Sequence, residues 1–156
     1  MAGEPAGVVG VEAWVPRQSD APNLDVARPL VVLESPYAGD TRRNEAYLRA
    51  CLRDSLERGE APYASHRMYT DALDDDDPAE RKLGIEAGFA WGQVAALRAF
   101  YVDLGWSRGM RFGELAAAEI DQPTEIRRLP LDVLAEILSP PEFQALRTQR
   151  IRAGVG

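Results

Sequence analysis

The chain has 156 residues, of which 46% are hydrophobic and 28% charged, so a disordered or collagen-like protein is excluded. Its 25 acidic residues against 18 basic ones give a net charge of −7, which argues against a protein that coats a DNA or RNA polymer. No apolar run approaches the roughly 18 residues of a membrane span, and a single cysteine, Cys51, permits no disulfide within the chain.

Residues 1–28 read as a partly irregular leader, because prolines and glycines interrupt them throughout. Only Val8–Val15 has the character of a short strand. The start of the chain has no Lys or Arg ahead of an apolar stretch, so we expect no secretory signal and a cytoplasmic location. Residues 29–156 are predicted to form one domain.

The domain is predicted to begin with a buried strand at Leu30–Leu33, a short continuous apolar run. A turn-rich loop follows, and then a helix over Thr41–Arg58, capped by Asp40 or Thr41 and ended by Gly59. Residues 62–65 predict a second strand. A long polar loop over Arg67–Asp77 comes next, and we expect it to be mobile and to cover a ligand crevice.

The second predicted helix has Asp77 as N-cap, Pro78 at its first position and Glu80 closing a capping-box-like pair, and it extends to about Arg98. Three glycines recur on it at four-residue spacing. Each costs roughly 1 kcal/mol relative to Ala in a helix. Their spacing therefore indicates a close backbone approach, either to the sheet or to a second copy of the helix, at Gly84, Gly88 and Gly92.

The remaining elements are a strand at 99–102, a helix from about 108 to 120, a strand at 124–128 and two closing helices at 131–138 and 141–151. This alternation predicts an α/β fold with a parallel sheet covered by helices on both faces. The expected architecture is a small flavodoxin-like or Rossmann-like three-layer sandwich, with four or five mainly parallel strands and C-terminal helices.

A ligand crevice in an open parallel sheet lies beyond the carboxyl ends of the strands. Helix N-termini and an arginine there favour an anion, whereas carboxylates there suit sugar hydroxyls or an anomeric carbon. This combination predicts a nucleoside or nucleotide ligand. The rule selects Glu34, Ser35, Tyr37, Gly39 and Asp40 after the first strand, His66 after the second, and Asp103, Ser107 and Arg108 after the third.

Three motifs carry a resemblance to a known family: SPY at 35–37, LDD at 73–75 with DPAER at 77–81, and DLGWSRGM at 103–110. The chain resembles, over about residues 29–129, the nucleoside 2-deoxyribosyltransferase-like superfamily, in particular an uncharacterised phage and bacterial branch of it. The resemblance implies a homo-oligomer that acts on nucleosides or nucleoside monophosphates, and we expect no cofactor. The acidic run at 74–77 is not expected to hold a metal, because adjacent residues rarely converge on one ion. Active members cleave the N-glycosidic bond, by hydrolysis or by deoxyribosyl transfer.

The resemblance also implies a carboxylate nucleophile on the helix after the Ser107 turn. The Glu-x-x-x-Ala pattern assigns it to Glu114, whereas counting back from Gln122-Pro123 assigns the slot to Gly113. Asp103 is expected to orient the sugar or assist protonation of the base. The remaining expected site residues hold sugar and phosphate: Ser35, Pro36, Tyr37, Gly39, Asp40, His66, Ser107, Arg108, Gly109 and Met110.

Two functions of other classes stay open. One is a non-catalytic nucleotide-binding module, which is favoured if Glu114 faces away from the crevice. The other is an interaction protein that self-associates through the glycine face. Individual residues also have plain structural interpretations: Cys51 and Trp91 suit the core, Glu34 either pairs with an arginine or works in the site, and Arg108 either binds an anion or pairs with an acidic neighbour.

Overall fold

The computed structural model describes residues 25–155, so the predicted strand at 8–15 lies outside the described residues. The described part folds into four strands and six helices. Their bounds are β1 Leu30–Glu34, α1 Thr41–Glu57, β2 Ala61–Tyr63, α2 Ser65–Met68, α3 Pro78–Val94, β3 Leu97–Tyr101, α4 Arg108–Glu119, β4 Thr124–Arg127, α5 Leu131–Ile137 and α6 Pro140–Ala153.

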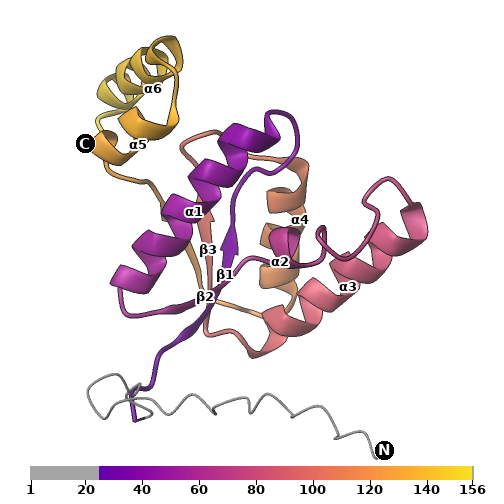
Figure 1. The fold of residues 1–156 in the computed structure, drawn as a ribbon. Coiled ribbons are helices and arrows are strands. Elements are labelled where there is room, and N and C mark those ends of the chain that lie inside the picture. Colours follow the sequence, from indigo (N-terminus) through magenta and orange to yellow (C-terminus); the bar gives the residue numbers. More distant parts are fainter. Residues whose placement is uncertain (1–24, 156) are drawn as a thin grey trace, which may run out of the picture.

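The four strands form one parallel sheet in the order β2-β1-β3-β4. This is the strand order of flavodoxin-like doubly wound sheets, in which the ligand crevice lies where the order reverses, between β1 and β3. Figure 1 shows the sheet edge-on, with α1 on one face and α3 and α4 on the other. The predicted three-layer α/β fold is confirmed.

The two faces of the sheet differ in chemistry because side chains alternate along each strand. On β1 and β3 one set of side chains belongs to the apolar core beneath α1: Val31, Leu33, Leu97, Ala99 and Tyr101. The alternate positions, on the face toward α3 and α4, are Val32, Glu34, Arg98 and Phe100. A buried ion pair therefore occupies one face and an apolar cluster the other.

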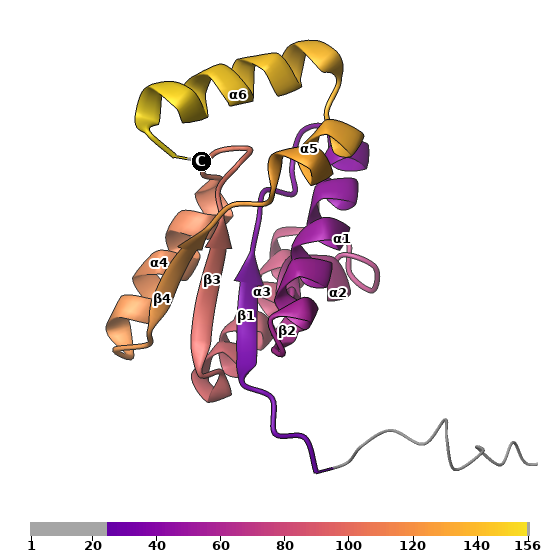
Figure 2. The same ribbon diagram turned by 90° about the vertical axis from the view of Figure 1, so that its left-hand side faces the viewer.

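The apolar core is completed by α1 and by the two C-terminal helices. Tyr47, Leu48 and Cys51 of α1 are buried in it, so the prediction of Cys51 as a core residue is confirmed. Leu134 of α5 and Leu146 of α6 join the same cluster. Figure 2 shows α5 and α6 beyond the carboxyl ends of the strands, and Figure 1 shows them on the same side of the sheet as α1.

Asp103, which is separated from the end of β3 by Val102, links the two C-terminal helices to the sheet. Its carboxylate accepts hydrogen bonds from the Tyr47 hydroxyl at 2.7 Å and from the Leu129 backbone N–H at 2.9 Å, and it forms a buried ion pair with Arg150 of α6. The side chain is fully buried. Asp103 is thus committed to a structural network, and the structure does not place it where a ligand is handled.

The boundary between α3 and β3 differs from the prediction, which extended the helix to about Arg98. The helix ends at Val94 because other groups take its last carbonyls: the Gln122 side-chain amide donates to Gly92 O and Ala95 O, at 2.8 and 2.9 Å. Directly after the helix, the Ala96 N–H donates a hydrogen bond to Leu30 O and so begins the pairing of this segment with β1. Sheet pairing outcompetes the helix propensity of the alanines.

The segment predicted as a polar loop, Arg67–Asp77, contains more structure than expected. Its start belongs to the short helix α2, and Tyr69 and Leu73 lie against Gly84 of α3. The predicted cap is half right: the Asp77 carboxylate accepts from two N–H groups of α3, but Glu80 accepts from the Asp74 N–H instead of closing a box. Whether the segment moves stays a prediction.

The glycines of α3 confirm a close approach, and the approach is to the protein's own side chains. A Cβ atom at Gly92 would lie 2.5 Å from Arg98 Nη2, and one at Gly84 would touch Tyr69 and Leu73 at 3.3 Å. The glycine face is therefore not a free surface for a second copy.

Trp91, expected in the core, is instead half-exposed, and its indole N–H donates to the Tyr69 hydroxyl.

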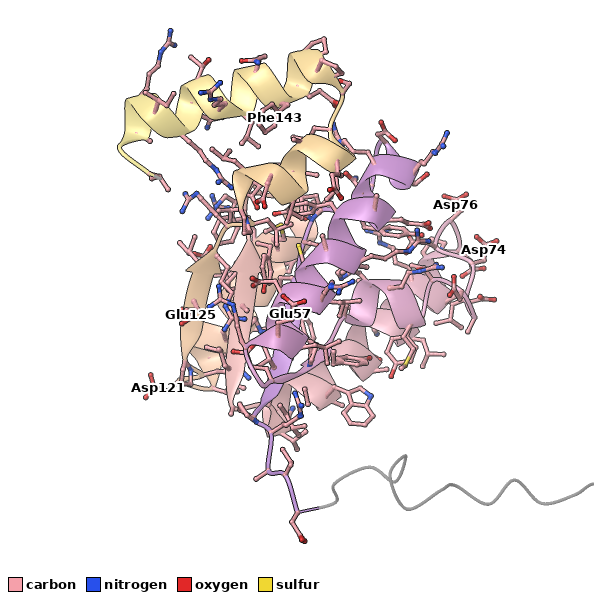
Figure 3. The ribbon with its side chains drawn as sticks, turned by 60° about the vertical axis from the view of Figure 1, so that its left-hand side comes forward. Glu57, Asp74, Asp76, Asp121, Glu125 and Phe143 are labelled. Atoms are coloured by element: carbon pink, nitrogen blue, oxygen red, sulfur yellow. The ribbon has the colours of Figure 1, made fainter. Side chains whose placement is uncertain are left out.

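The acidic residues responsible for the negative charge are spread over the surface. Figure 3 shows Asp74 and Asp76 on the loop before α3, and the other labelled carboxylates, Glu57, Asp121 and Glu125, on different elements. In the part of the chain that the structure describes, no helix has the length and apolar character needed to cross a membrane.

We predict that Asp103→Asn destabilises the fold strongly, because it removes one charge of a buried pair and leaves Arg150 uncompensated. Breaking such a pair typically costs about 3–5 kcal/mol. Urea unfolding followed by circular dichroism measures the effect. The exposed Glu119→Gln on α4 loses the same charge without a buried partner, and equal stability of the two variants would contradict the role assigned to Asp103.

Candidate functional site

A cavity of about 570 Å³ lies on the α3/α4 face of the sheet, at the carboxyl ends of β1 and β3. Strand residues form its floor, and α2, α3 and the first turns of α4 form its walls. Its size falls within the range of small-molecule sites. The cavity thus occupies the crevice that the strand order predicts.

Seven of the twelve predicted site residues line this cavity: Ser35, Tyr37, His66, Ser107, Arg108, Gly109 and Met110. The other five are Pro36, Gly39, Asp40, Asp103 and Glu114. Asp40 caps α1, accepting from the Arg43 N–H at 3.1 Å, and Gly39 supplies the positive φ of the turn before it. The buried Asn44 side chain donates hydrogen bonds to the carbonyls of Tyr37 and Ala38, both at 2.9 Å, and holds this loop in place.

Glu114 does not reach the cavity. It is exposed on α4, where its carboxylate accepts from Arg111 at 3.0 Å. The neighbouring Gly113 is buried and lines the cavity instead. Consecutive residues of a helix are rotated by about 100°, so of the two positions that the sequence left open only Gly113 faces the ligand crevice.

Glu34 and Arg98 form a buried ion pair at the floor of the cavity. Arg98 Nη1 lies 2.5 Å from Glu34 Oε1, and the exposed fractions of the two side chains are 4% for Arg98 and 11% for Glu34. Arg98 Nε also donates to the Gln122 side chain at 3.1 Å. Of the two alternatives that the sequence left open for Glu34, pairing with an arginine is confirmed, and the pair also lines the cavity.

Two glycines make room for this pair. A Cβ at Gly92 would lie 2.5 Å from Arg98 Nη2, and one at Gly113 would lie 2.6 Å from Glu34 Oε1 and 3.2 Å from Arg98 Nη1. Contacts below 3.0 Å are incompatible with a Cβ unless a group moves. The helices α3 and α4 therefore pass directly over the ion pair.

Burial raises the pKa of the Glu34 carboxyl to about 7, although the charge and hydrogen bond of Arg98 pull it back down. The desolvation of the carboxylate dominates because little water reaches the floor of the cavity. Glu34 therefore changes charge near neutral pH, a property that is concentrated at functional sites.

His66 and Ser35 form a second polar pair at the cavity wall, with Ser35 Oγ 3.3 Å from His66 Nε2. The ring packs edge-on against Tyr37, and its Nδ1 atom is buried without a partner among the described residues. Burial lowers the pKa of His66 to about 4, so the imidazole is neutral at physiological pH. It offers hydrogen bonding but no positive charge.

The arginines of the cavity differ in what they contact. Arg98 pairs with Glu34, and Arg81 pairs with Asp75 at 2.8 Å. Arg108, at the first position of α4, packs against the Phe112 ring and contacts no carboxylate in the part of the chain that the structure describes. Ser107 caps the same helix end, accepting from the Met110 N–H.

Sequence reasoning missed the α3 wall and the partner of Glu34. The wall includes Ile85, Gly88 and Phe89, whose spacing on one helix indicates a shared face but not what that face covers. Arg98 had a detectable signal, since a lone arginine between Leu97 and Ala99 in a short apolar run needs a buried counter-charge. Glu34, at the end of the neighbouring strand, is that counter-charge.

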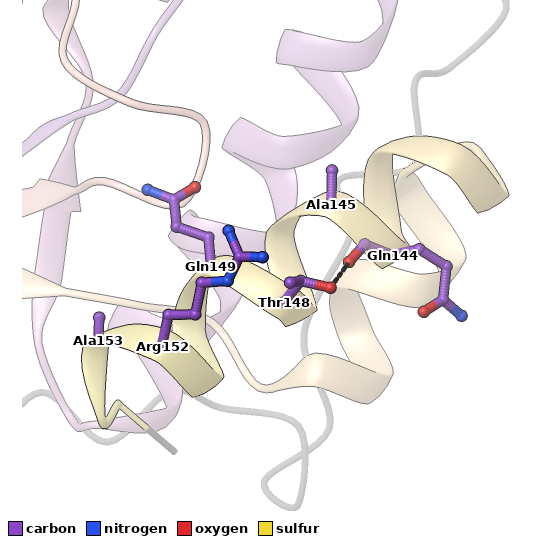
Figure 4. Close-up of a pocket in the computed structure, with 6 residues that line it drawn as sticks. All are labelled: Gln144, Ala145, Thr148, Gln149, Arg152 and Ala153. Carbon is purple, nitrogen blue, oxygen red and sulfur yellow. Dashed lines mark hydrogen bonds between the residues drawn. The ribbon is translucent and has the colours of Figure 1, made fainter.

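Two further features do not form part of this site. Among the described residues, no group of three or more His, Cys, Asp or Glu side chains converges as a metal site would, the run at 74–77 included. A separate open hollow of about 710 Å³ runs along one face of α6, lined by Gln144, Ala145, Thr148, Gln149, Arg152 and Ala153 (Figure 4). All its residues come from a single helix.

The fold and the cavity together define a small Rossmann-like α/β domain with a ligand-sized crevice at the switch point of its sheet. The chain belongs to the family described as "Domain of unknown function (DUF7768)", which it matches over residues 29–127. This range contains the whole sheet and every residue that lines the crevice. No curated protein and no solved structure matches the chain.

We predict that the stability difference between the wild type and Glu34→Gln depends on pH between 4.5 and about 7. The folded state holds the Glu34 proton more tightly than the unfolded chain, whose pKa is near 4.5. The wild type therefore loses free energy of unfolding relative to the variant as pH rises through this window. Urea unfolding of both proteins at several pH values measures the difference.

The other titratable and charged groups at the cavity come from every element around it: Arg98 on β3, His66 on α2, Arg108 on α4, Glu80 and Arg81 on α3, and Tyr37, Tyr69 and Asp75 in the loops. The His66 pKa of about 4 lies below the window. A pH-independent difference, or one of opposite sign, would contradict the raised pKa of Glu34.

Proposed function

We propose that the domain binds a nucleoside monophosphate in the cavity at the carboxyl edge of its sheet. One observation carries the proposal: a single cavity joins a polar floor and an apolar wall to a helix N-terminus whose arginine, Arg108, pairs with no carboxylate of the described residues. Of the predicted functions, this is the nucleotide-binding one, because the carboxylate assigned to catalysis, Glu114, lies outside the cavity.

The start of α4 is the proposed phosphate position. The N–H groups of a first helical turn lack intrahelical partners and the helix dipole favours negative charge there. Arg108 adds a guanidinium that no carboxylate among residues 25–155 neutralises, whereas the Arg81 and Arg98 guanidinium groups already face carboxylates. Because His66 is neutral, Arg108 is the cation left at the cavity for an anionic ligand group.

The rest of the cavity suits a nucleoside. Tyr37, Ile85 and Phe89 offer apolar and aromatic surface for a base. Ser35 and His66 offer hydrogen-bonding groups for sugar hydroxyls, as does the Glu34 carboxylate at the floor. This arrangement of apolar walls with a few convergent polar groups is typical of small-molecule sites.

We predict that Arg108→Ala weakens the binding of a nucleoside monophosphate by about ten- to a hundredfold, which corresponds to the roughly 1.5–3 kcal/mol of a charged hydrogen bond. The matching nucleoside lacks the phosphate and should lose much less affinity. Isothermal calorimetry with both ligands, on wild type and variant, measures the four constants.

Arg111→Ala is the matched control for this experiment. It removes the same charge from the same helix, but its guanidinium stacks on Trp106 at 4.1 Å and pairs with Glu114, outside the cavity. Its effect on both ligands should be small. Equal losses for nucleoside and nucleotide in Arg108→Ala, or no binding of either to the wild type, would overturn the proposed function.

Self-association stays a prediction. One of its two grounds, the glycine face of α3, is turned toward the protein's own side chains, and the other is the resemblance to a usually oligomeric family. Large apolar side chains exposed on α4 and β4, namely Phe112, Leu115 and Ile126, offer a different surface for a second copy. Light scattering at micromolar concentration should show a species heavier than the 17.2 kDa monomer. A monomer alone would contradict the prediction.

A further inference from the structure

We infer that two copies of the domain pair through the outer face of α3, with the two helices antiparallel across a two-fold axis. This outer stripe consists of Leu83, Ala87, Ala90 and Val94. It lies on the side of α3 away from the cavity and is distinct from the glycine face. The inference assigns the predicted self-association to one surface and does not depend on the ligand proposed for the cavity.

Helix α3 buries very little for its length. Of its 17 residues, Gly88 and Gly92 are the buried ones, and none of the 17 belongs to the apolar core. Helix α1 has the same length and places Tyr47, Leu48 and Cys51 in that core. Because helices in proteins are stabilised chiefly by the packing of an apolar face, α3 needs a further contact surface.

The outward side of α3 is apolar although it faces solvent. A surface helix normally turns a polar face outward, and a helix that is apolar all round is normally buried. Yet the exposed fractions are 58% for Leu83 and 63% for Val94, and Ala90 is also exposed. Figure 1 shows α3 along the outside of the molecule, on the side of the sheet away from α1. No segment among residues 25–155 therefore covers this face.

The four residues of the outer stripe share one helix face because they recur at spacings of four, three and four. At about 100° per residue they fall within roughly 60° of one another around the helix axis, nearly opposite Gly88 and Gly92. Alternating spacings of three and four are typical of the contact line between two paired helices. The half-exposed Trp91 adjoins the stripe and widens the apolar surface. This surface suits a second helix.

The order of side chains along the stripe points to a second copy of the same helix. The stripe runs large, small, small, large, and its spacings and sizes are the same in either direction. In an antiparallel pair related by a two-fold axis, Leu83 of one copy faces Val94 of the other, and Ala87 faces Ala90. The central alanines let the two helix axes approach closely, which brings the larger side chains at both ends into contact.

Electrostatic repulsion does not oppose this contact, although the chain carries a net charge of −7. The stripe itself has no charged side chain, and at its margin Lys82 and Glu86 form an ion pair at 3.5 Å within each copy. By contrast, Leu115 on α4 has Arg111 and Glu119 one turn before and after it. We therefore expect α3, and not α4, to form the pair.

Pairing also supports the wall of the cavity. Ile85, Gly88 and Phe89 on the inner side of α3 line the cavity, so this helix has a hollow on one side and solvent on the other. A partner on the outer stripe holds the helix from outside. The backbone amides of α3 should therefore exchange hydrogen more slowly as the protein concentration rises through the dissociation constant of the pair.

Light scattering of the full chain at micromolar concentration should give at least twice the 17.2 kDa mass of one copy. Ala90→Arg should raise the dissociation constant at least about a hundredfold, because each pair would bury two guanidinium groups without partners. Position 90 is exposed, so a single copy can carry an arginine there and still fold. Ala118→Arg makes the same change at an exposed alanine of α4, and this matched control should leave the dissociation constant unchanged.

A disulfide experiment checks the antiparallel arrangement without the arginine variant. A chain with both Leu83→Cys and Val94→Cys should form a covalent dimer on oxidation, because the two positions face each other across the pair. Within one helix they lie about 16 Å apart, which is too far for a disulfide. Each single variant should give little covalent dimer, since each position is equally far from its own copy in the partner. The natural Cys51 is buried.

The contrary outcomes are distinct from one another. A wild type that stays monomeric at micromolar concentration overturns the inference, and slow hydrogen exchange of α3 in that monomer would assign the cover to another part of the same chain. Dissociation by Ala118→Arg but not by Ala90→Arg would place the contact on α4 and also overturn it. Equal yields of covalent dimer from the single and double cysteine variants would contradict the antiparallel pair. Nucleotide binding, present or absent, leaves the inference untouched.

Discussion

The ion pair between Glu34 and Arg98 is the constraint around which the ligand-side half of the domain is arranged. It joins the two central strands on the face toward α3 and α4. The helices α3 and α4 pack closely over the pair and keep water away from it. They can do so because Gly92 and Gly113 have no side chains that would collide with Arg98 and Glu34. Gln122 extends the same network: it accepts from Arg98 and donates to the last carbonyls of α3, so it links the ion pair to the end of that helix.

The opposite face of the sheet carries stability in a different way. There an apolar cluster under α1 continues into α5 and α6, and Asp103 ties α6 to the end of β3 through Arg150. A second buried pair, Arg127 with Glu60, lies on the same side beside Tyr101. The apolar core therefore lies on the α1 face of the sheet, and the cavity on the α3/α4 face takes no contacts from it. Glu34 ends the central strand β1 and Asp103 follows the central strand β3. Of the two, only Glu34 lies on the face that holds the cavity.

The fold could be predicted from the sequence because strand and helix alternate with clear signals, such as the Asp77-Pro78 start of α3 and the short apolar runs of β1 and β3. The rule that ligands lie at the carboxyl edge found the loops after β1 and β3 and also His66. It could not say on which face of the sheet a residue lies, so it placed Asp103 in the site. The rule also missed the α3 wall, because it considers only residues that follow strands. Phe89 lines the cavity because α3 packs beside it, and that packing could not be predicted from the sequence.

Glu34 and Gly113 act together as one structural feature, although they lie 79 positions apart in the sequence and on different elements. Read alone, Glu34 is a charged residue at the end of a buried strand and Gly113 a poor helix residue. Together they place one carboxylate in one volume, next to one arginine. A carboxylate carried by a strand takes its position from the sheet register, and Arg98 fixes one of its oxygens at the cavity floor. A group that is fixed before a ligand arrives loses little conformational entropy on binding, so this arrangement suits a residue that contacts a ligand.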